Sequence, residues 1–197
     1  MANSKWKVFA NAPWKSSISI RPGFNHSPFT IYYSPMTMFQ LRAGFSEQVE
    51  WRTSAEAARE FFGDLKNFVE LMPGVERITA DARGIARWLI RAEVPVVGAI
   101  RQAFAVHKSV DEPTRIEWSP AAGESQNLLR YAATFDPRGE TTRIRIEQRV
   151  ELRRKSAREL HTLAPLAGES RLSAALQKGV TEMLQAFLTK ARARLEK

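Results

Sequence analysis

The chain has 197 residues, of which 44% are hydrophobic, and it carries a formal net charge of +9 at pH 7. This size and composition fit one globular domain with room for an extension. The sequence contains no run of about 18 apolar residues that could span a bilayer, no apolar secretory-signal core, and no cysteine for disulfides or thiolate metal sites. We therefore expect a cytoplasmic protein.

The positive charge is concentrated toward the two ends of the chain. Residues 51–148 contain fourteen Lys or Arg and fourteen Asp or Glu, whereas residues 149–197 contain eleven and five. Basic ends suit an acidic protein, a phosphate or the anionic cytoplasmic surface of a membrane, and a solvated basic helix would give the same count. The basic clusters do not alternate with aromatic residues as a base-stacking surface does. Nucleic acid is therefore disfavoured, and Arg153, Arg154 and Lys155 are candidates for docking a partner.

Residues 1–44 differ in composition from the rest of the chain. Four prolines exclude a long helix here, and the segment holds eight of the nineteen aromatic residues. Because disordered tails are poor in aromatic residues, we predict an extended arm that docks either on its own domain or on another subunit. The candidate docking residues are Trp6, Trp14, Phe29, Tyr32, Tyr33 and Phe39.

One strand and two short helices are predicted after the arm. The stretch FSEQVEW (45–51) alternates as a strand does, and Ser54 is a helix N-cap before residues 55–62. The stretch DLKNFVELM (64–72) indicates a second short helix. Pro73-Gly74 ends this helix, because proline disfavours helical backbone in the preceding residue and glycine accepts the turn.

Six further strands and one long helix are predicted in the remainder. The strand-like runs are 75–82, 84–94, 97–110, 114–119, 126–135 and 141–152, and short turn segments separate them. Such short connections predict an antiparallel meander. From Ser170 onward, apolar residues recur on one broad stripe, which predicts a C-terminal helix roughly 38 Å long.

This order of elements resembles the START-like (SRPBCC) superfamily, which includes polyketide cyclase/dehydrase and lipid-transport-like proteins. The resemblance covers about residues 45–195 and is carried by MPGVERI (72–78), WLIRAEVPVVGAIRQAF (88–104) and TRIEWSP (114–120). These stretches look most like the carbon monoxide dehydrogenase G subgroup. The resemblance implies an α+β helix-grip fold, in which a curved antiparallel sheet of about seven strands wraps a long C-terminal helix around a hydrophobic cavity. We therefore divide the chain into an arm (1–44) and a helix-grip domain (45–197).

The resemblance also implies a function for Pro73-Gly74, where the predicted helix 64–72 ends. In this superfamily the two short helices and the loop after them close one end of the cavity. Met72, Pro73 and Gly74 are therefore candidates for the hinge of a lid. A simple helix end would explain the same residues.

Strand alternation assigns one face of the sheet to the core, and three polar residues interrupt that face: Glu47, Gln102 and Gln148. A buried polar group without a partner costs about 1–3 kcal/mol. These residues, and the Tyr131 hydroxyl, are therefore candidates for orienting a ligand in a cavity of roughly several hundred Å³, unless they reach solvent or satisfy each other. The predicted ligand-binding residues are Glu47, Trp51, Trp88, Ile90, Gln102, Phe104, Trp118, Tyr131, Gln148, Met183 and Phe187.

The sequence contains few residues arranged for catalysis. His26, His107 and His161 form no metal-binding or catalytic motif, and we predict no metal and no cofactor. The favoured function is non-catalytic binding of a hydrophobic small molecule, such as a lipid, quinone, pigment or polyketide-like compound. One alternative is an accessory subunit docked peripherally on a membrane-associated redox complex through the arm and the basic C-terminus. The other is a polyketide cyclase/dehydrase-like enzyme.

Overall fold

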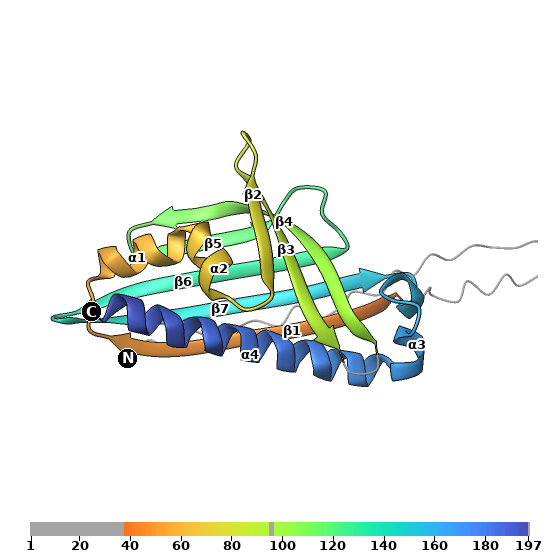
Figure 1. Cartoon of the computed structure of the whole chain (residues 1–197). Coiled ribbons are helices and arrows are strands. Elements are labelled where there is room, and N and C mark those ends of the chain that lie inside the picture. The colour runs from red at the N-terminus through yellow and green to blue at the C-terminus, as the bar shows by residue number, and fades with distance from the viewer. Residues whose placement is uncertain (1–37, 95–96, 197) are drawn as a thin grey trace, which may run out of the picture. The chain divides into compact units, whose positions relative to one another are not determined.

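The structure is a computed structural model that describes residues 38–94 and 97–196. Figure 1 shows the elements of this part of the chain. In chain order they are β1 (Phe39–Trp51), α1 (Ala55–Gly63), α2 (Leu65–Leu71), β2 (Val75–Ala80), β3 (Ile85–Val94), β4 (Gly98–Glu112), β5 (Arg115–Pro120), β6 (Asn127–Arg138), β7 (Thr141–Arg154), a 3₁₀ turn (Ala157–Glu159), α3 (Ala164–Ala167) and α4 (Glu169–Leu195).

The strands form one seven-stranded antiparallel sheet in the order β1-β7-β6-β5-β4-β3-β2. Strands β2 to β7 are paired in chain order, as the predicted meander requires. The first strand pairs with the last and forms one edge of the sheet, and Phe45 lies opposite Gln148. The predicted α+β helix-grip fold is therefore confirmed.

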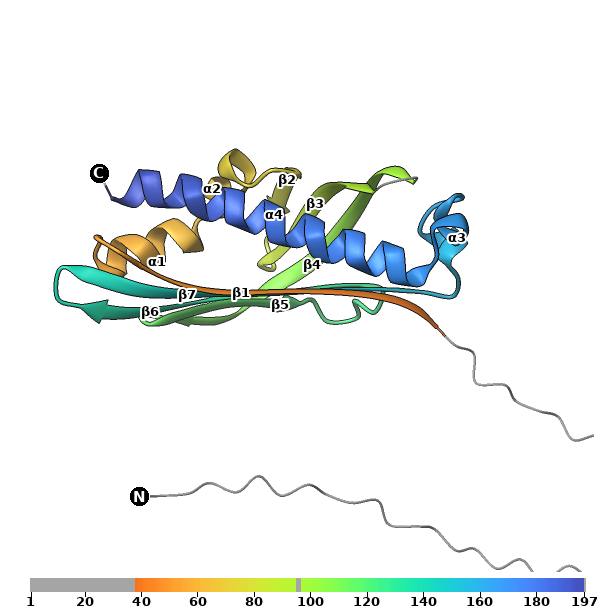
Figure 2. The same cartoon turned by 90° about the horizontal axis from the view of Figure 1, so that it is seen from below.

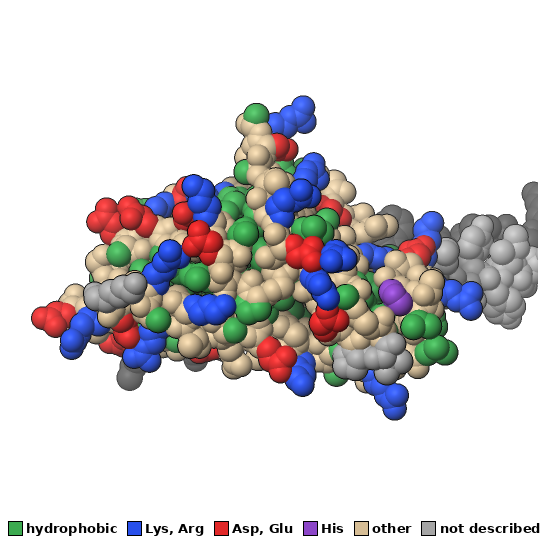
Figure 3. Space-filling view, in the orientation of Figure 1, with side chains coloured by type: hydrophobic (Ala, Val, Ile, Leu, Met, Phe, Trp, Pro, Cys, Tyr) green, Lys and Arg blue, Asp and Glu red, His purple; other side chains and the backbone are tan. Residues whose placement is uncertain are grey.

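The helices lie on one face of the sheet (Figure 2). Helix α4 runs along the sheet and buries an apolar stripe that includes Leu172, Val180, Leu184 and Phe187. Acidic and basic side chains are interspersed over the face seen in Figure 3, with hydrophobic side chains between them. None of the helices in the described part of the chain combines the length and the apolar character that a bilayer span requires.

Aromatic rings fill the inner face of the sheet beneath α1 and α2. Phe68 of α2 stacks on Phe187 of α4 with a distance of 4.8 Å between ring centroids, and it meets Tyr131 edge-on at 5.2 Å. Trp51 stacks on Phe62 at 6.0 Å. Such pairs contribute about 0.5–1.5 kcal/mol beyond the burial of their area. The inner face of the sheet beneath α1 and α2 is therefore filled by packed aromatic side chains.

Helix α4 also protects the free edge of β1. The side-chain amide of Gln177 accepts a hydrogen bond from Gly44 N at 2.9 Å, and its Nε2 donates to Gly44 O at 2.7 Å. Just after the end of β1, Arg52 N donates to Oε1 of Glu196, the C-cap of α4, at 3.1 Å. These side chains satisfy backbone groups that an edge strand otherwise leaves open to another strand.

A buried carboxylate lies on the outer face of the sheet. Arg115 Nη2 donates to Glu117 at 2.7 Å, Ser119 Oγ donates at 3.1 Å, and Arg130 Nη1 lies 3.1 Å away. The hydrogen bond from Arg115, together with these neighbours, lowers the pKa of Glu117 against the opposing effect of burial. Ser109, at the point where the pairing of β4 with β5 shifts register, bonds to Ser119.

Several element boundaries differ from those predicted, most of them by one to three residues. β1 begins at Phe39 and not at Phe45, so residues 39–44, which were assigned to the arm, form the first half of this strand. Phe39 lies opposite Arg154 and packs against the core while staying half-exposed, and its role in docking a partner stays a prediction. The 3₁₀ turn and α3 between β7 and α4 were not predicted, and α4 begins at Glu169. The other predicted docking residues of the arm, Trp6, Trp14, Phe29, Tyr32 and Tyr33, lie outside the described residues.

Candidate functional site

A cavity of about 70 Å³ lies between the sheet and α4. Residues of β1, β3, β4 and β7 form its sheet wall, residues from Leu172 to Met183 of α4 form the opposite wall, and Leu160 contributes before α3. The cavity is smaller than the several hundred Å³ predicted, because aromatic rings occupy the other half of the inner face. It is also smaller than the roughly 150 Å³ of an engineered apolar cavity that binds benzene.

The half-exposed lining residues gather on β3 and α4. Ile90 and Val94 of β3 and Leu176, Gly179 and Met183 of α4 are all of this kind, so the cavity opens between these two elements. A ligand of more than a few atoms would have to move these side chains or extend through the mouth. Met183 is suited to such movement, because its unbranched side chain adapts easily in shape.

Five of the predicted ligand-binding residues line this cavity: Ile90, Gln102, Phe104, Gln148 and Met183. The others lie elsewhere. Glu47 is half-buried on the inner face opposite Ile146 and is not part of the cavity lining. The remaining five belong to the buried core away from the lining: Trp51, Trp88, Trp118, Tyr131 and Phe187.

Gln148 is the buried polar residue of the cavity wall. It lies on β7 between Phe45 of β1 and Tyr131 of β6, and only 3% of it is exposed. No residue of the described part of the chain hydrogen-bonds to its amide, and the other buried lining residues are apolar. An amide in this position is available to a bound molecule.

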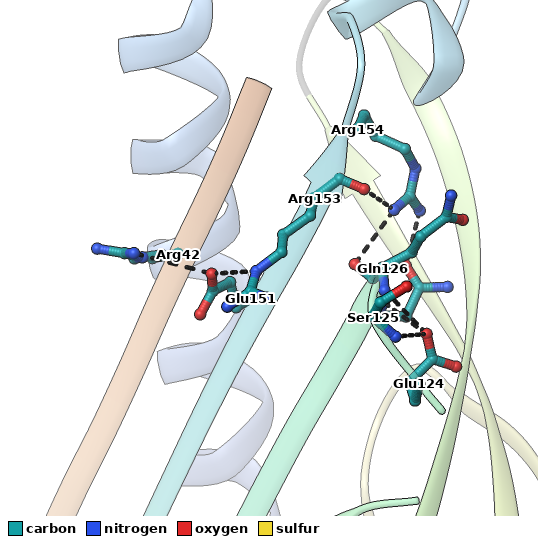
Figure 4. Close-up of polar contacts among 8 residues, drawn as sticks. Arg42, Glu124, Ser125, Gln126, Glu151, Arg153 and Arg154 are labelled. Carbon is teal, nitrogen blue, oxygen red and sulfur yellow. Dashed lines mark hydrogen bonds and ion pairs between the residues drawn. The ribbon is translucent and has the colours of Figure 1, made fainter. Parts of the chain in front are cut away.

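Gln102 is held by Arg154, whose contacts with Gln126 and Arg153 are drawn in Figure 4. Arg154 Nη2 donates to Gln102 Oε1 and to Asn127 Oδ1, both at 2.7 Å, and Nη1 donates to Arg153 O at 2.7 Å and to Gln126 O at 3.2 Å. Arg154 is 7% exposed, and desolvation lowers the pKa of its guanidinium. All of these acceptors are uncharged.

Hydrogen bonds to Glu124 hold the loop before β6 in place. This loop carries two of the acceptors of Arg154, Gln126 O and Asn127 Oδ1. Glu124 Oε1 accepts hydrogen bonds from the backbone N–H groups of Ser125, Gln126 and Asn127, each at 3.0 Å (Figure 4). Asn127 Nδ2 donates to Ala103 O at 2.9 Å, which ties β6 to β4 beyond the end of β5.

The position of Arg154 corrects its prediction as a surface docking residue. It continues the inward alternation of β7 through Gln148, Val150 and Leu152, a pattern from which its burial could have been predicted. Its neighbour Arg153 forms an ion pair with Glu151 at 2.7 Å, and Lys155 is exposed.

Three polar atoms in the aromatic core have no hydrogen-bond partner in the described part of the chain: Trp88 Nε1, Trp118 Nε1 and the Tyr131 hydroxyl. Burial raises the pKa of Tyr131 well above its ordinary value. Trp118 is also covered by the Lys108 ammonium, 5.5 Å from the ring centroid. Because these residues do not line the cavity, they are not placed to orient a ligand there.

The candidate hinge packs against the cavity wall. Gly74 has φ of +83°, and a Cβ atom at this position would lie 2.6 Å from Arg91 O and 3.0 Å from Met183 Cε. Arg91 N donates to Gly74 O at 2.7 Å. Met72 caps α2 and is buried, and Pro73 follows it in the turn. These contacts require glycine at position 74, and a hinge at Pro73-Gly74 stays a prediction.

No protein-family model matches the sequence, and no curated protein does. Solved structures are similar in fold at low sequence identity. The di-domain ARO/CYC StfQ from the steffimycin biosynthetic pathway gives a TM-score of 0.55 at 14% identity over 79% of this chain and 51% of its own. The aromatase/cyclase ZhuI from Streptomyces sp. R1128 gives 0.53 at 14% over 78% and 95%.

A START superfamily protein from Mycobacterium smegmatis gives a TM-score of 0.50 at 17% identity over 78% of this chain and 97% of its own. The chain spans about half the length of the di-domain proteins StfQ and BexL. Similarity at these identities concerns the fold. The predicted resemblance to the carbon monoxide dehydrogenase G subgroup is not among these similarities and stays a prediction. The sheet order, the packing of the long helix α4 against the sheet and these similarities together assign the described part of the chain the START-like helix-grip fold.

Proposed function

We propose that this domain binds a small, mainly apolar molecule in the cavity between the sheet and α4. The observation that carries the proposal is the amide of Gln148, a buried residue that lines the cavity without a hydrogen bond to a described residue, in a wall that is otherwise almost entirely apolar. An unpaired buried amide costs about 1–3 kcal/mol. Ligand sites combine an apolar lining with a few polar groups in this way.

The lining supports binding rather than catalysis. None of the described residues that line the cavity carries a titratable side chain, and general acid or base catalysis needs such a group within reach of the reacting atoms. The aromatase/cyclase neighbours support a polyketide-like ligand, and a lipid, a quinone or a pigment also fits the apolar walls. An enzymatic role would require a group from outside this lining.

Docking as an accessory subunit on a membrane-associated complex is the second function that we predicted. Five of its six aromatic candidates in the arm lie outside residues 38–94 and 97–196, Phe39 belongs to β1, and Arg154 is buried within the domain. Attachment to a protein partner or to an anionic lipid surface therefore stays a prediction without a supporting contact.

Gly179 offers a direct test of the cavity. It lines the α4 wall, and a Cβ atom added there would have no atom within 4 Å apart from its chain neighbours and its own helix backbone. Gly179→Leu therefore has room for its Cβ atom and adds a larger apolar side chain at this wall, and either Leu or Ala at this position improves helix propensity by about 1 kcal/mol. Gly179→Ala is the matched control, because it adds the same propensity and only one methyl group.

The measurement is the ¹³C-methyl NMR signal of Met183 during titration with α-methylstyrene, an apolar probe. The wild type and Gly179→Ala should show a saturable shift of this signal, and Gly179→Leu should show none while it stays folded. Absence of a saturable shift in the wild type, or an equal shift in Gly179→Leu, would overturn the proposed function.

A further inference from the structure

The cavity has two side-chain amides in an otherwise apolar lining, those of Gln102 and Gln148. Gln102 lies on β4 directly opposite Ile90 of β3, at the half-exposed mouth. Gln148 lies deeper, on β7, and is buried. The polar groups that a ligand meets in the lining are therefore these two amides.

Arg154 determines which end of the Gln102 amide faces it. A guanidinium donates hydrogen bonds and accepts none, so the atom at 2.7 Å from Arg154 Nη2 must be the amide oxygen. The Nε2 group of Gln102 is then directed away from Arg154. It has no acceptor among the described residues, so its N–H groups are free to donate to a molecule in the cavity.

Arg154 itself has no terminal N–H group left for a ligand. Its four Nη hydrogens match the four acceptors Gln102, Asn127, Gln126 and Arg153. A ligand carboxylate would therefore find no free pair of donors on the guanidinium, and burying such a charge without a partner is costly. A neutral acceptor is the better match for the free amide hydrogens.

We infer that the cavity selects an apolar molecule carrying a neutral carbonyl oxygen, such as a ketone, which accepts a hydrogen bond from Gln102 Nε2. Arg154 acts as a positioning residue, because it holds the oxygen of Gln102 and so presents the nitrogen. Gln148 supplies a second amide donor deeper in the cavity. This inference rests on the proposed function, since it concerns the ligand of the same cavity.

The test compares acetophenone with α-methylstyrene, two probes of the same shape in which a carbonyl oxygen replaces a methylene group. Each dissociation constant is measured by NMR for the wild type and for Gln102→Leu, and the variant-to-wild-type ratio removes the difference in water solubility between the probes. Loss of one hydrogen bond should weaken acetophenone about 5- to 10-fold and change α-methylstyrene less than about twofold. Gln185→Leu, the same change at an exposed site of α4, should alter neither value.

Gln148→Leu is the second variant, because Gln148 does not hold Arg154 and its replacement leaves that network intact. Arg154→Lys tests positioning: it keeps the charge but cannot reach all four acceptors, so Gln102 is freed and acetophenone alone should weaken. If α-methylstyrene binds the wild type and both Leu variants change the two probes equally, the carbonyl inference is overturned and the proposed function stands. If α-methylstyrene does not bind the wild type, the proposed function itself fails.

Discussion

Replacing Gln148 by Leu should stabilise the unliganded protein. The Gln148 residue is 3% exposed, and its amide lines the cavity without a hydrogen bond to a described residue. Leu has a similar size and suits the apolar wall formed by neighbours such as Val150 and Leu172. Since a native hydrogen bond is not lost, the substitution removes a desolvation penalty and creates no new one.

The size of the effect follows from that penalty. An unpaired buried amide costs about 1–3 kcal/mol, and a change of 1 kcal/mol shifts the Tm of a domain of this size by about 2–4 °C. Gln148→Leu should therefore raise the Tm by about 2–12 °C in thermal unfolding followed by circular dichroism, without added ligand.

Gln177→Leu is the matched control, because the same chemical change there removes two hydrogen bonds to Gly44 at 2.9 and 2.7 Å. Gln and Leu have similar helix propensities, so the control should lower stability by about 1 kcal/mol. A Tm that falls in Gln148→Leu as much as in Gln177→Leu would show that the Gln148 amide is already satisfied within the protein and would refute the reasoning.

Three further predictions concern stability. Gly74→Ala should lower the free energy of unfolding in urea by about 1–3 kcal/mol, because of the positive φ and the 2.6 Å approach to Arg91 O; an unchanged value would contradict the tight turn. Phe187→Ala should cost about 3–5 kcal/mol in the same assay, since Phe187 is fully buried against Phe68, and a loss below about 1 kcal/mol would contradict a solid core. The folded-state pKa of Glu117 is lowered from 4.5, so its stabilisation is present above that pH and is lost as pH falls through the folded-state value. Glu117→Gln should therefore show a flatter fall of Tm between about pH 6 and pH 3 than the wild type, and equal slopes would refute this assignment.

The sequence predicted the elements that repeat a regular pattern. Alternation along 141–152 and the helical stripe of 172–195 identify β7 and α4, because the spacing of the apolar residues marks the face of each element that is buried in the core. The same alternation extended by two residues would have placed Arg154 inside the domain. The start of β1 was missed because Ala43 and Gly44 interrupt the contrast between apolar and polar positions.

The candidate site was predicted only in part. The five residues of the predicted set that line the cavity lie on β3, β4, β7 and α4, and alternation or the helical stripe identified each of them. Alternation could not separate them from Trp51, Trp88 and Trp118, which share the inner face but lie in the solid core. Which half of the face stays open depends on how large side chains from distant elements fill the space.

The sequence by itself determined the class of fold, because hydrophobic periodicity and turn residues are local properties of the chain. The tertiary structure decided where space remains and which polar groups are left unpaired. Gln102 and Arg154 are 52 residues apart in the chain, and only the approach of β6 and β7 to β4 beyond the end of β5 brings them into contact. That contact with a guanidinium, which only donates hydrogen bonds, turns the amide nitrogen of Gln102 away from Arg154 and frees it for a ligand.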